Sequence, residues 1–493
     1  MIRSLLIANR GEIAVRIART AQEMGIEAIG VYSQADADAF HLSHVARAES
    51  LGEGPPRATY LSIPRILEAA RASGAEAVHP GYGFLSESAS FARAVQEAGL
   101  LWIGPPPESI EAMGDKLGAR KRMRAAGVPV VPGSEELSAD SGEVASAADA
   151  VGYPLLVKAA AGGGGKGMAR VDRREDLPAA VEATRRIAVA AFDNGRVYLE
   201  RLFPRPRHVE FQVFGDRHGN LVHLFERECS VQRRHQKIVE ETPSMALDHR
   251  LRTAMGRAAV EAAKAVGYVG AGTVEFLLDE RGDFYFLEMN TRLQVEHPIT
   301  EETLGLDLVR GQIEIASGAA LPSDWRAGNI AAQGHAIELR LYAEDPVEFL
   351  PRSGSIAVWE EPVGPGVRVD AGVGAGTTVG LDFDPLLAKL VVSAPTRPAA
   401  IERARRALAD WVVLGVETNL PLLTRVLASE EFGSGRYATD LVAAIGPPVP
   451  PDPGDAEWIA AALALSRGPG GAAPRERAAG DPWDSSSGWR TGA

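Results

Sequence analysis

Short apolar runs alternate with segments of helical periodicity over the first hundred residues. The apolar runs predict strands, and apolar residues three or four positions apart predict helices. On this basis we expect strands at 4–8, 26–32 and 76–79 and helices at 12–23 and 63–72. Strands that alternate with helices are typical of a parallel sheet. We therefore predict a parallel α/β domain over residues 1–114.

The pattern changes twice beyond residue 114. Antiparallel strands mixed with helices indicate a second domain over 115–330, and further strands with one packing helix at 399–414 indicate a third over 331–445. Within the third, residues 336–343 alternate as a strand does, which places Glu338, Arg340 and Tyr342 on one face.

The remaining residues have a different composition. Residues 446–453 are proline-rich and read as a linker, and a helical turn is possible over 458–466. The rest of 446–493 is rich in Gly, Ala, Pro, Arg and Ser, and we expect much of this tail to be mobile.

A polar stretch directly follows the apolar residues Phe284 to Leu287. Hydrogen-bonding or charged side chains occupy every second position, at Glu288, Asn290, Arg292, Gln294 and Glu296. If this stretch is one extended strand, all of them point to the same face. Carboxylates, an amide and a guanidinium on one face can hold a metal ion beside an anion, as phosphoryl transfer requires. The alternative is an exposed hairpin with ordinary surface charges.

A preceding strand supplies another carboxylate. Residues 272–278 are β-prone, and 279–283 carry turn residues, so a hairpin places Glu275 opposite Leu287 or Glu288. Opposed Cβ atoms lie roughly 5 Å apart, and two carboxylates that close repel unless one takes a proton or a cation lies between them. Oxygen ligands from Glu275, Glu288 and Asn290 suit magnesium.

Two further segments favour anion binding. A strand ending at Lys158 precedes the glycine run 162–165 with Lys166, and consecutive glycines let backbone N–H groups surround a phosphate. A flexible linker has a similar composition. Residues 226–237 hold four fixed cations and a histidine, which can bind phosphate or bicarbonate or can form a solvated strand paired with nearby glutamates. The single cysteine, Cys229, reads as a small core residue rather than a nucleophile.

Composition limits the class of protein. The 493 residues suggest about three domains, and the net charge of −13 argues against a general nucleic-acid or membrane surface. With a single cysteine, the chain cannot form an intramolecular disulfide. The apolar run at the N-terminus is too short for the core of a signal peptide, and no apolar run reaches the length of a membrane span. We expect a cytoplasmic protein with no nucleic-acid or membrane partner.

Several long motifs in the same order resemble the biotin carboxylase family. They are residues 158–168, 232–237 and 288–298, together with 8–14 and 79–87, and the resemblance spans residues 2–445. It implies a pre-ATP-grasp domain over 1–114, an ATP-grasp domain over 115–330 with a mobile lid at about 130–203, and a β-rich biotin carboxylase C-terminal domain over 331–445. It also implies a ligase that carboxylates biotin with ATP, bicarbonate and Mg²⁺ or Mn²⁺ through carboxyphosphate.

The same resemblance assigns a role to individual residues. The implied ATP contacts are Lys116, Lys158, Gly164, Gly165, Glu200, Arg201, Phe203, His208, Gln232, His235, Glu275 and Glu288. The implied metal ligands are Glu275, Glu288 and Asn290, and the implied bicarbonate contacts are Lys237, Arg292, Gln294 and Val295. Glu296 is implied as the base that deprotonates bicarbonate, and Arg340 as the group that stabilises the biotin enolate, with Lys237 and Arg292 also catalytic.

Some positions depart from the family pattern. Ala161 and Lys166 change the glycine run without removing its four glycines or its charge. Residues 382–384 read Asp-Phe-Asp where Tyr-Tyr-Asp is common near biotin, so among biotin contacts Asp384 is retained. Arg19 and Glu23 match positions that help to form the family's homodimer.

The chain has no Ala-Met-Lys-Met biotinylation motif, so biotin is expected in trans. The nearest string, residues 112–114, lacks the lysine. The implied partners are a biotin carboxyl carrier protein or domain and the carboxyltransferase subunits of an acyl-CoA carboxylase. Residues 481–490 look like the segment that leads into a carrier region in longer subunits, which suggests a trimmed or shortened α-subunit. The alternatives are another ATP-grasp ligase with an acyl-phosphate intermediate and a non-catalytic nucleotide-binding scaffold.

Overall fold

The structure is a computed structural model that describes residues 2–138, 140–160, 167–325, 329–448, 454 and 458–459. The chain divides into two units, Met1–Pro448 and Val449–Ala493. Almost all described residues belong to the first unit, so the mobility expected for the tail and most of the helical turn expected at 458–466 lie outside the described residues. No helix in the described ranges combines the length and apolarity needed to cross a membrane.

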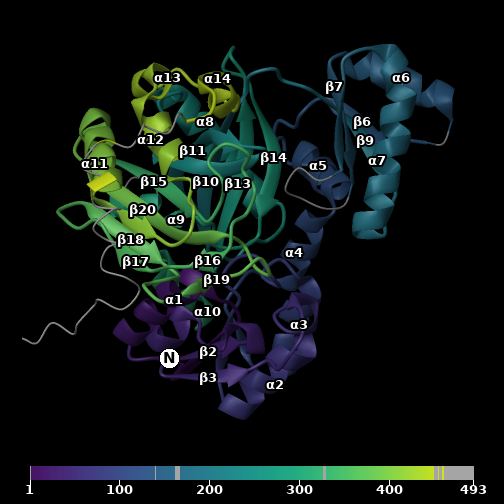
Figure 1. Ribbon diagram of the computed structural model, residues 1–493. Helices are drawn as coiled ribbons and strands as arrows, with labels where there is room; N and C mark the ends of the chain where they lie inside the picture. The colour runs from purple at the N-terminus through teal and green to yellow at the C-terminus, as the bar shows by residue number, and fades with distance from the viewer. Residues whose placement is uncertain are drawn as a thin grey trace, which may run out of the picture. The chain divides into compact units, whose positions relative to one another are not determined.

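The N-terminal region is a parallel five-stranded sheet in the order β3-β2-β1-β4-β5, as predicted (Figure 1). Leu6, Ile29 and Val78 are completely buried in its core together with Phe91 and Trp102. The elements are β1 (Ser4–Ile7), α1 (Gly11–Glu23), β2 (Glu27–Tyr32), β3 (Arg47–Ser50), α2 (Ile63–Ser73), β4 (Ala77–His79), α3 (Ala89–Glu97) and β5 (Leu101–Trp102). Short 3-10 helices lie at Gln34–Asp36, Phe40–His44 and Pro56–Ala58.

A four-stranded antiparallel sheet, in the order β6-β9-β7-β8, lies in the segment expected to form a lid. Alternation along β7 buries Leu155 and Val157 against α6 and α7, the helices that accompany this sheet (Figure 1). The elements here are α4 (Pro107–Gly114), α5 (Lys116–Ala125), β6 (Gly133–Glu136), α6 (Ser141–Val151), β7 (Leu155–Ala159), β8 (Met168–Val171), α7 (Leu177–Phe192) and β9 (Val197–Arg201), with a 3-10 helix at Arg174–Asp176.

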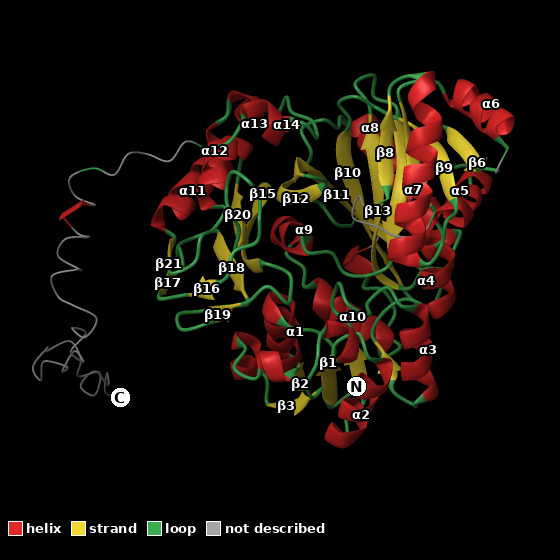
Figure 2. Cartoon of the chain, turned by 45° about the vertical axis from the view of Figure 1, so that its right-hand side comes forward, coloured by secondary structure: helices red, strands yellow, loops and turns green. Residues whose placement is uncertain are grey.

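The largest sheet described in the Met1–Pro448 unit has eight strands, in the order β14-β13-β10-β11-β12-β15-β20-β18 (Figure 2). It continues across residue 330, because β12 pairs with β15 in antiparallel register. The elements are β10 (Arg207–Gly215), β11 (Leu221–Arg233), β12 (Gln236–Thr242), α8 (His249–Lys264), β13 (Gly270–Leu278), β14 (Phe284–Asn290), α9 (His297–Leu304), α10 (Leu308–Ala316), β15 (His335–Tyr342), β18 (Val367–Ala371) and β20 (Leu386–Ala394), with a 3-10 helix at Ser323–Trp325.

The helix predicted over 399–414 is too long. The observed helix α11 (Arg397–Asp410) ends before Trp411, and Val412–Leu414 forms β21, which pairs with β17 (Val358–Glu360). Two β-branched valines and a partner strand outweigh the helical spacing of the apolar residues. The remaining elements are β16 (Gly354–Ser355), β19 (Thr378–Val379), α12 (Leu420–Ala428), α13 (Glu430–Ser434) and α14 (Leu441–Ile445).

Candidate active site

A cavity of about 890 Å³ brings together residues from all three regions of the chain. Its lining includes seventeen of the residues implied by the family resemblance: Lys116, Lys158, Glu200, Arg201, Phe203, His208, Gln232, His235, Lys237, Glu275, Glu288, Asn290, Arg292, Gln294, Val295, Arg340 and Asp384. Glu296 is completely buried and bonded to two of these residues. Gly164 and Gly165 lie outside the described residues.

Strand alternation explains why buried charges face this cavity. On β10, Val209 and Phe211 belong to a hydrophobic core that includes residues of α8, whereas the intervening residues have the opposite orientation. Glu210 therefore points away from α8, where it contacts Arg227 of β11. The guanidinium of Arg227 reaches Thr300 of α9 at 2.9 Å, so α9 covers the polar face of the sheet.

The β13–β14 hairpin sets two carboxylates directly opposite each other, which confirms the predicted placement. Glu275 is the cross-strand partner of Glu288, and Asn290 Nδ2 lies 3.1 Å from Glu275 Oε1. Burial, and then the charge of Glu275, raise the pKa of Glu288. Burial acts to raise the pKa of Glu275 too, but Lys237 and His208 outweigh burial and the pKa lies below its ordinary value.

This donor set fits a hard divalent cation. Two carboxylates and an amide offer only oxygen ligands, and a cation between Glu275 and Glu288 offsets their repulsion. Two other groups in the described part of the chain have metal-ligand spacing: His208 with Glu210 and Glu275, and Glu210 with Cys229 and Glu296. Both include Glu210, which is paired with two cations, Arg227 and Lys237, so we favour the hairpin set with its facing carboxylates as the metal site.

The expectation of one extended strand through Glu296 is wrong. Strand β14 ends at Asn290, and residues 291–296 form an irregular segment that leads into α9. Side-chain bonds nevertheless hold the polar groups together: Arg292 Nη2 donates to Asn290 Oδ1 at 2.7 Å and Nη1 donates to Gln294 Oε1 at 2.8 Å. Gln294 in turn donates to Glu275 at 3.0 Å. The segment therefore gathers anion-binding donors beside the hairpin without strand geometry.

Lys237 lies among three carboxylates. Its Nζ is 2.5 Å from Glu210, 2.8 Å from Glu275 and 2.7 Å from Glu296. Burial would raise the pKa of Glu296, but Lys237, Arg340 and Arg227 outweigh burial and hold that pKa well below its ordinary value. Glu296 is therefore ionised at neutral pH and can accept a proton.

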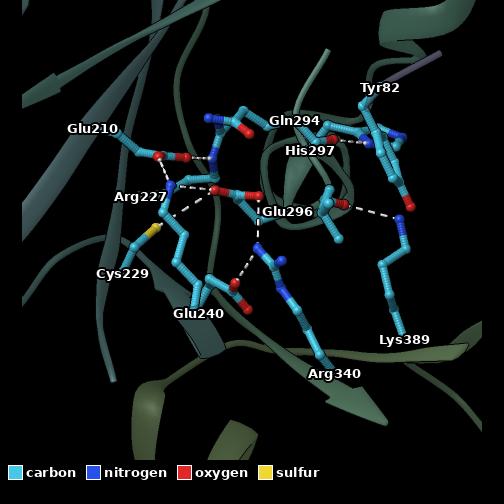
Figure 3. A network of polar contacts seen from close by, with 12 residues as sticks. Tyr82, Glu210, Arg227, Cys229, Glu240, Gln294, Glu296, His297, Arg340 and Lys389 are labelled. Atoms are coloured by element: carbon cyan, nitrogen blue, oxygen red, sulfur yellow. Dashed lines mark hydrogen bonds and ion pairs between the residues drawn. The ribbon is translucent and has the colours of Figure 1, made fainter. Parts of the chain in front are cut away.

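Arg340 also contacts the carboxylate of Glu296 (Figure 3). Its Nη2 lies 2.9 Å from Glu296 Oε2 and 2.5 Å from Glu240 Oε1. The backbone carbonyl of Arg340 accepts a hydrogen bond from Asn419 Nδ2 at 3.0 Å, which fixes this part of β15. Arg340 and Tyr342, which the alternation along β15 was predicted to place on one face, both line the cavity.

The other end of the cavity offers cations and aromatic surface. Lys158 Nζ lies 2.6 Å from Glu200, which also binds Arg120, and Lys116 is close enough to influence the pKa of Glu200. Phe203 stacks on Tyr285 with ring centroids 5.0 Å apart. Nearer the hairpin, His208 lies 2.8 Å from Glu275 and 2.9 Å from Gln232.

The solvated-strand interpretation of residues 226–237 is wrong for Arg227 and Arg233, whereas Arg234 is exposed as that interpretation expects. Arg227 is completely buried and bonded to Glu210, and the buried Arg233 pairs with Glu344. His235 is exposed at the turn between β11 and β12 but lines the cavity. Cys229 is buried as expected, and burial raises the pKa of its thiol well above the ordinary value.

Sequence reasoning assigned no role to several charged residues around the site. Glu87 lies 3.1 Å from Arg292 Nε and accepts a hydrogen bond from Thr291 N at 3.2 Å. Glu210 and Glu240 each bind a proposed catalytic cation. A charge between two apolar residues was the available signal for Glu210, whereas Glu240 lies in the mainly polar strand β12 and gave no such signal.

Family models cover most of the chain. The model described as "Biotin carboxylase, N-terminal domain" matches residues 1–110. "Carbamoyl-phosphate synthase L chain, ATP binding domain" matches 115–324, and "Biotin carboxylase C-terminal domain" matches 338–444.

Curated relatives and solved structures agree with these matches. Biotin carboxylase of Halalkalibacterium halodurans is 49% identical over 442 residues, which are 90% of this chain and 97% of the relative. Biotin carboxylase 2 of Bacillus subtilis is 48% identical over 90% of this chain and 99% of the relative. The biotin carboxylase structure from Campylobacter jejuni superposes with a TM-score of 0.87 at 43% identity, covering 90% of this chain and 99% of that one. The biotin carboxylase domain dimer of Hydrogenobacter thermophilus 2-oxoglutarate carboxylase, in complex with MgADP, ADP and bicarbonate, gives the same TM-score and identity, covering 90% and 98%. The chain belongs to the biotin carboxylase family.

Proposed function

We propose that this chain carboxylates biotin in two linked steps within one cavity. A bicarbonate oxygen attacks the γ-phosphorus of ATP, so that carboxyphosphate forms and ADP leaves. Carboxyphosphate then breaks into CO2 and phosphate, the phosphate takes the proton of the biotin ureido nitrogen, and that nitrogen bonds to CO2. The observation that carries the proposal is Glu296, held between Lys237 and Arg340 beside the hairpin carboxylates.

Bicarbonate binding is assigned to Lys237, Arg292, Gln294 and Val295. Arg292 and Gln294 bond to each other at 2.8 Å next to Asn290, which supports a preformed set of donors. Glu296 is the proton acceptor, because it is ionised and its partner Lys237 belongs to the same anion pocket. Arg340 is assigned to the enolate oxygen of biotin, and fixed cations beside a developing anion lower the barrier of such steps.

ATP is assigned to the end of the cavity with Lys116, Lys158 and Glu200, together with Arg201, Phe203, His208, Gln232, His235, Gly164 and Gly165. Lys158 and Lys116 supply positive charge for phosphates, and the donor oxygens of Glu275, Glu288 and Asn290 would hold magnesium or manganese. That ion, when bound, neutralises charge on the transferring phosphate. Residues 130–203 are assigned to the lid.

Biotin is assigned to the part of the cavity lined by Arg340 and Asp384, and it arrives on a carrier protein or domain. Carboxyltransferase subunits use the product, and relatives at similar identity are named for pyruvate and methylcrotonoyl-CoA carboxylases. A homodimer involving Arg19 and Glu23 and a cytoplasmic location complete the proposal. Arg19 and Glu23 are both exposed, and Glu23 lies 3.7 Å from Arg310. Both Arg19 and Glu23 are therefore available at the surface for a dimer contact.

The direct test of this function is ADP release by the purified chain with ATP, Mg²⁺ and bicarbonate. We expect release to require bicarbonate and to increase when free biotin is added. Arg292→Ala should lose this activity while keeping the melting temperature close to that of the wild type, and Glu360→Gln, on the exposed end of β17, serves as a matched control. Release that added biotin does not increase would favour another acyl-phosphate ligase, and full activity of Arg292→Ala would refute the bicarbonate site.

A further inference from the structure

Two buried glutamates next to Arg340 have no role in the chemistry described so far. Glu240 of β12 and Glu338 of β15 are direct cross-strand partners, and both are completely buried. Within the described residues, none of their four carboxyl oxygens has a hydrogen-bond partner. Glu240 lies 2.5 Å from Arg340 Nη2 as an ion pair without hydrogen-bond geometry. Such groups are costly to bury in charged form.

Charged groups from several neighbouring elements surround this pair. Glu240 faces Arg340 from β15, Glu296 from the segment before α9 and Lys237 from its own strand, and the thiol of Cys229 on β11 is also close enough to interact with it. Glu338 faces Lys389 from β20, and also Glu240, Arg340 and Glu296. Lys389 is itself shared with Glu12 of α1 and Asp370 of β18, and it donates to the carbonyl of Val295. Figure 3 shows Arg340 between Glu240 and Glu296, with Lys389 on a separate contact.

Carboxylates therefore outnumber the cations available to them. Arg340 lies between Glu240 and Glu296, and Lys389 has three carboxylates around it. Burial raises the pKa of Glu240 to about 7, with Arg340 acting against burial and Glu296 adding to it. Burial also raises the pKa of Glu338 well above its ordinary value, with Lys389 opposing. Burial without a hydrogen-bond partner therefore favours the neutral form of Glu338, whereas Glu240 changes charge near pH 7.

Resting on the proposed function, we propose that Glu240 is a positioning residue. Its buried carboxyl group, paired with Arg340 and opposite Glu338, exchanges a proton with solvent and thereby sets how firmly Arg340 is held. With Glu240 ionised, two carboxylates compensate Arg340. With Glu240 neutral, only Glu296 does, and more of the positive charge of Arg340 acts on an anionic oxygen of the substrate. This role differs from that of Glu296, because Glu240 does not line the cavity and its ion pair is with Arg340.

The activity test compares biotin-stimulated with biotin-independent ADP release at each pH. Dividing one rate by the other cancels ionisations that affect ATP cleavage alone. The ratio in the wild type should fall about tenfold between pH 6 and pH 8, because the neutral fraction of a carboxyl group changes about tenfold per pH unit above its pKa. Glu240→Gln should remove this fall, and Glu338→Gln, which keeps a neutral side chain, should retain it. A Glu240→Gln profile parallel to the wild type would overturn the proposal.

A stability measurement tests the proton without requiring activity. The raised pKa means that the folded protein holds a proton on Glu240 that the unfolded chain releases above about pH 4.5, so stability falls from pH 4.5 to about 7 and is level above. The melting temperature of Glu240→Gln, relative to wild type, should therefore rise over that window, whereas Glu360→Gln should follow the wild type. A constant difference overturns the proposal. The difference in melting temperature could also rise in a chain whose ADP release biotin does not stimulate. That result would support a proton on Glu240 and would refute the proposed function instead.

Discussion

Glu296 shows how one residue combines opposite requirements. Lys237 and Arg340 keep its carboxylate ionised, which is necessary for a base but makes it a weak one. A bound bicarbonate close to Lys237 and Arg292 competes for the same cations. A negative charge at that place acts to raise the pKa of Glu296, so a bound bicarbonate would make Glu296 a stronger base.

Replacing this residue gives a first prediction. Glu296→Gln keeps the size of the side chain but cannot accept the proton. We expect the rate of bicarbonate-dependent ATP cleavage to fall about 10²- to 10⁴-fold, the usual contribution of a positioned general base. Steady-state ADP release measures it, with circular dichroism to establish folding. A loss smaller than threefold would contradict the assignment of Glu296.

Glu87 gives a second prediction, because it contacts Arg292 and not the reacting atoms. Its carboxylate lies 3.1 Å from Arg292 Nε and accepts from Thr291 N. Glu87→Gln removes the charge from a partly exposed ion pair worth up to about 1 kcal/mol, so the KM for bicarbonate should rise by up to about fivefold. The KM for ATP is the internal control; an equal rise in both constants would indicate a general defect.

Without the family resemblance, the position of a residue in the site could be predicted only where short-range spacing in the sequence determined it. Glu275 and Glu288 were placed correctly because a short turn joins their strands. Glu210, Glu240 and Glu87 were missed because their partners lie 27, 100 and 205 positions away in the chain, at Lys237, Arg340 and Arg292. Contacts at such separations depend on strand order, which alternation does not determine.

Among the elements, the β13–β14 hairpin is the one that local sequence predicts best. Its turn, register and facing carboxylates follow from strand and turn propensities. The same alternation continues into residues 291–296, but there the chain leaves the sheet. Side-chain hydrogen bonds and the start of α9 determine that segment, and period-two spacing of polar residues cannot reveal them.

Removing one hairpin charge gives a third prediction. Burial and Glu275 disfavour the charge of Glu288, so Glu288→Gln should raise the melting temperature at pH 8 without Mg²⁺. The same change removes a ligand oxygen, and the increase in melting temperature caused by Mg²⁺ with ATP should become smaller. Thermal unfolding with and without the ion measures both effects. A lower melting temperature in the metal-free variant would contradict the repulsion described for the pair.

At the scale of the Met1–Pro448 unit, buried ion pairs connect regions far apart in sequence. Arg16 of α1 lies 2.7 Å from Glu301 of α9 and 2.9 Å from Asp307. Glu301 also binds Arg368 of β18 at 2.9 Å, and Arg368 binds Asp370. The parallel N-terminal sheet was predictable from alternating strands and helices. The pairing of β12 with β15 across residue 330 was not, because it joins strands about a hundred residues apart.

This network gives a fourth prediction. Arg16→Met leaves Glu301 and Asp307 without one cation, and breaking a buried pair from one side costs about 3–5 kcal/mol. Urea unfolding should show a decrease in the free energy of unfolding of that size, with one transition because the network spans the unit. Arg3→Met is the control, because Arg3 is mostly exposed in its pair with Glu76. A cost below about 1 kcal/mol would show that the network does not join these regions.

Oxygen transfer tests the central claim, the formation of carboxyphosphate, most directly. With ¹⁸O-labelled bicarbonate, unlabelled ATP and Mg²⁺, attack of a bicarbonate oxygen on the γ-phosphorus leaves that oxygen on the phosphate when carboxyphosphate breaks down. Mass spectrometry of the released phosphate should therefore find one ¹⁸O atom per turnover from fully labelled bicarbonate. Phosphate without the label, released in a bicarbonate-dependent reaction, would contradict this account.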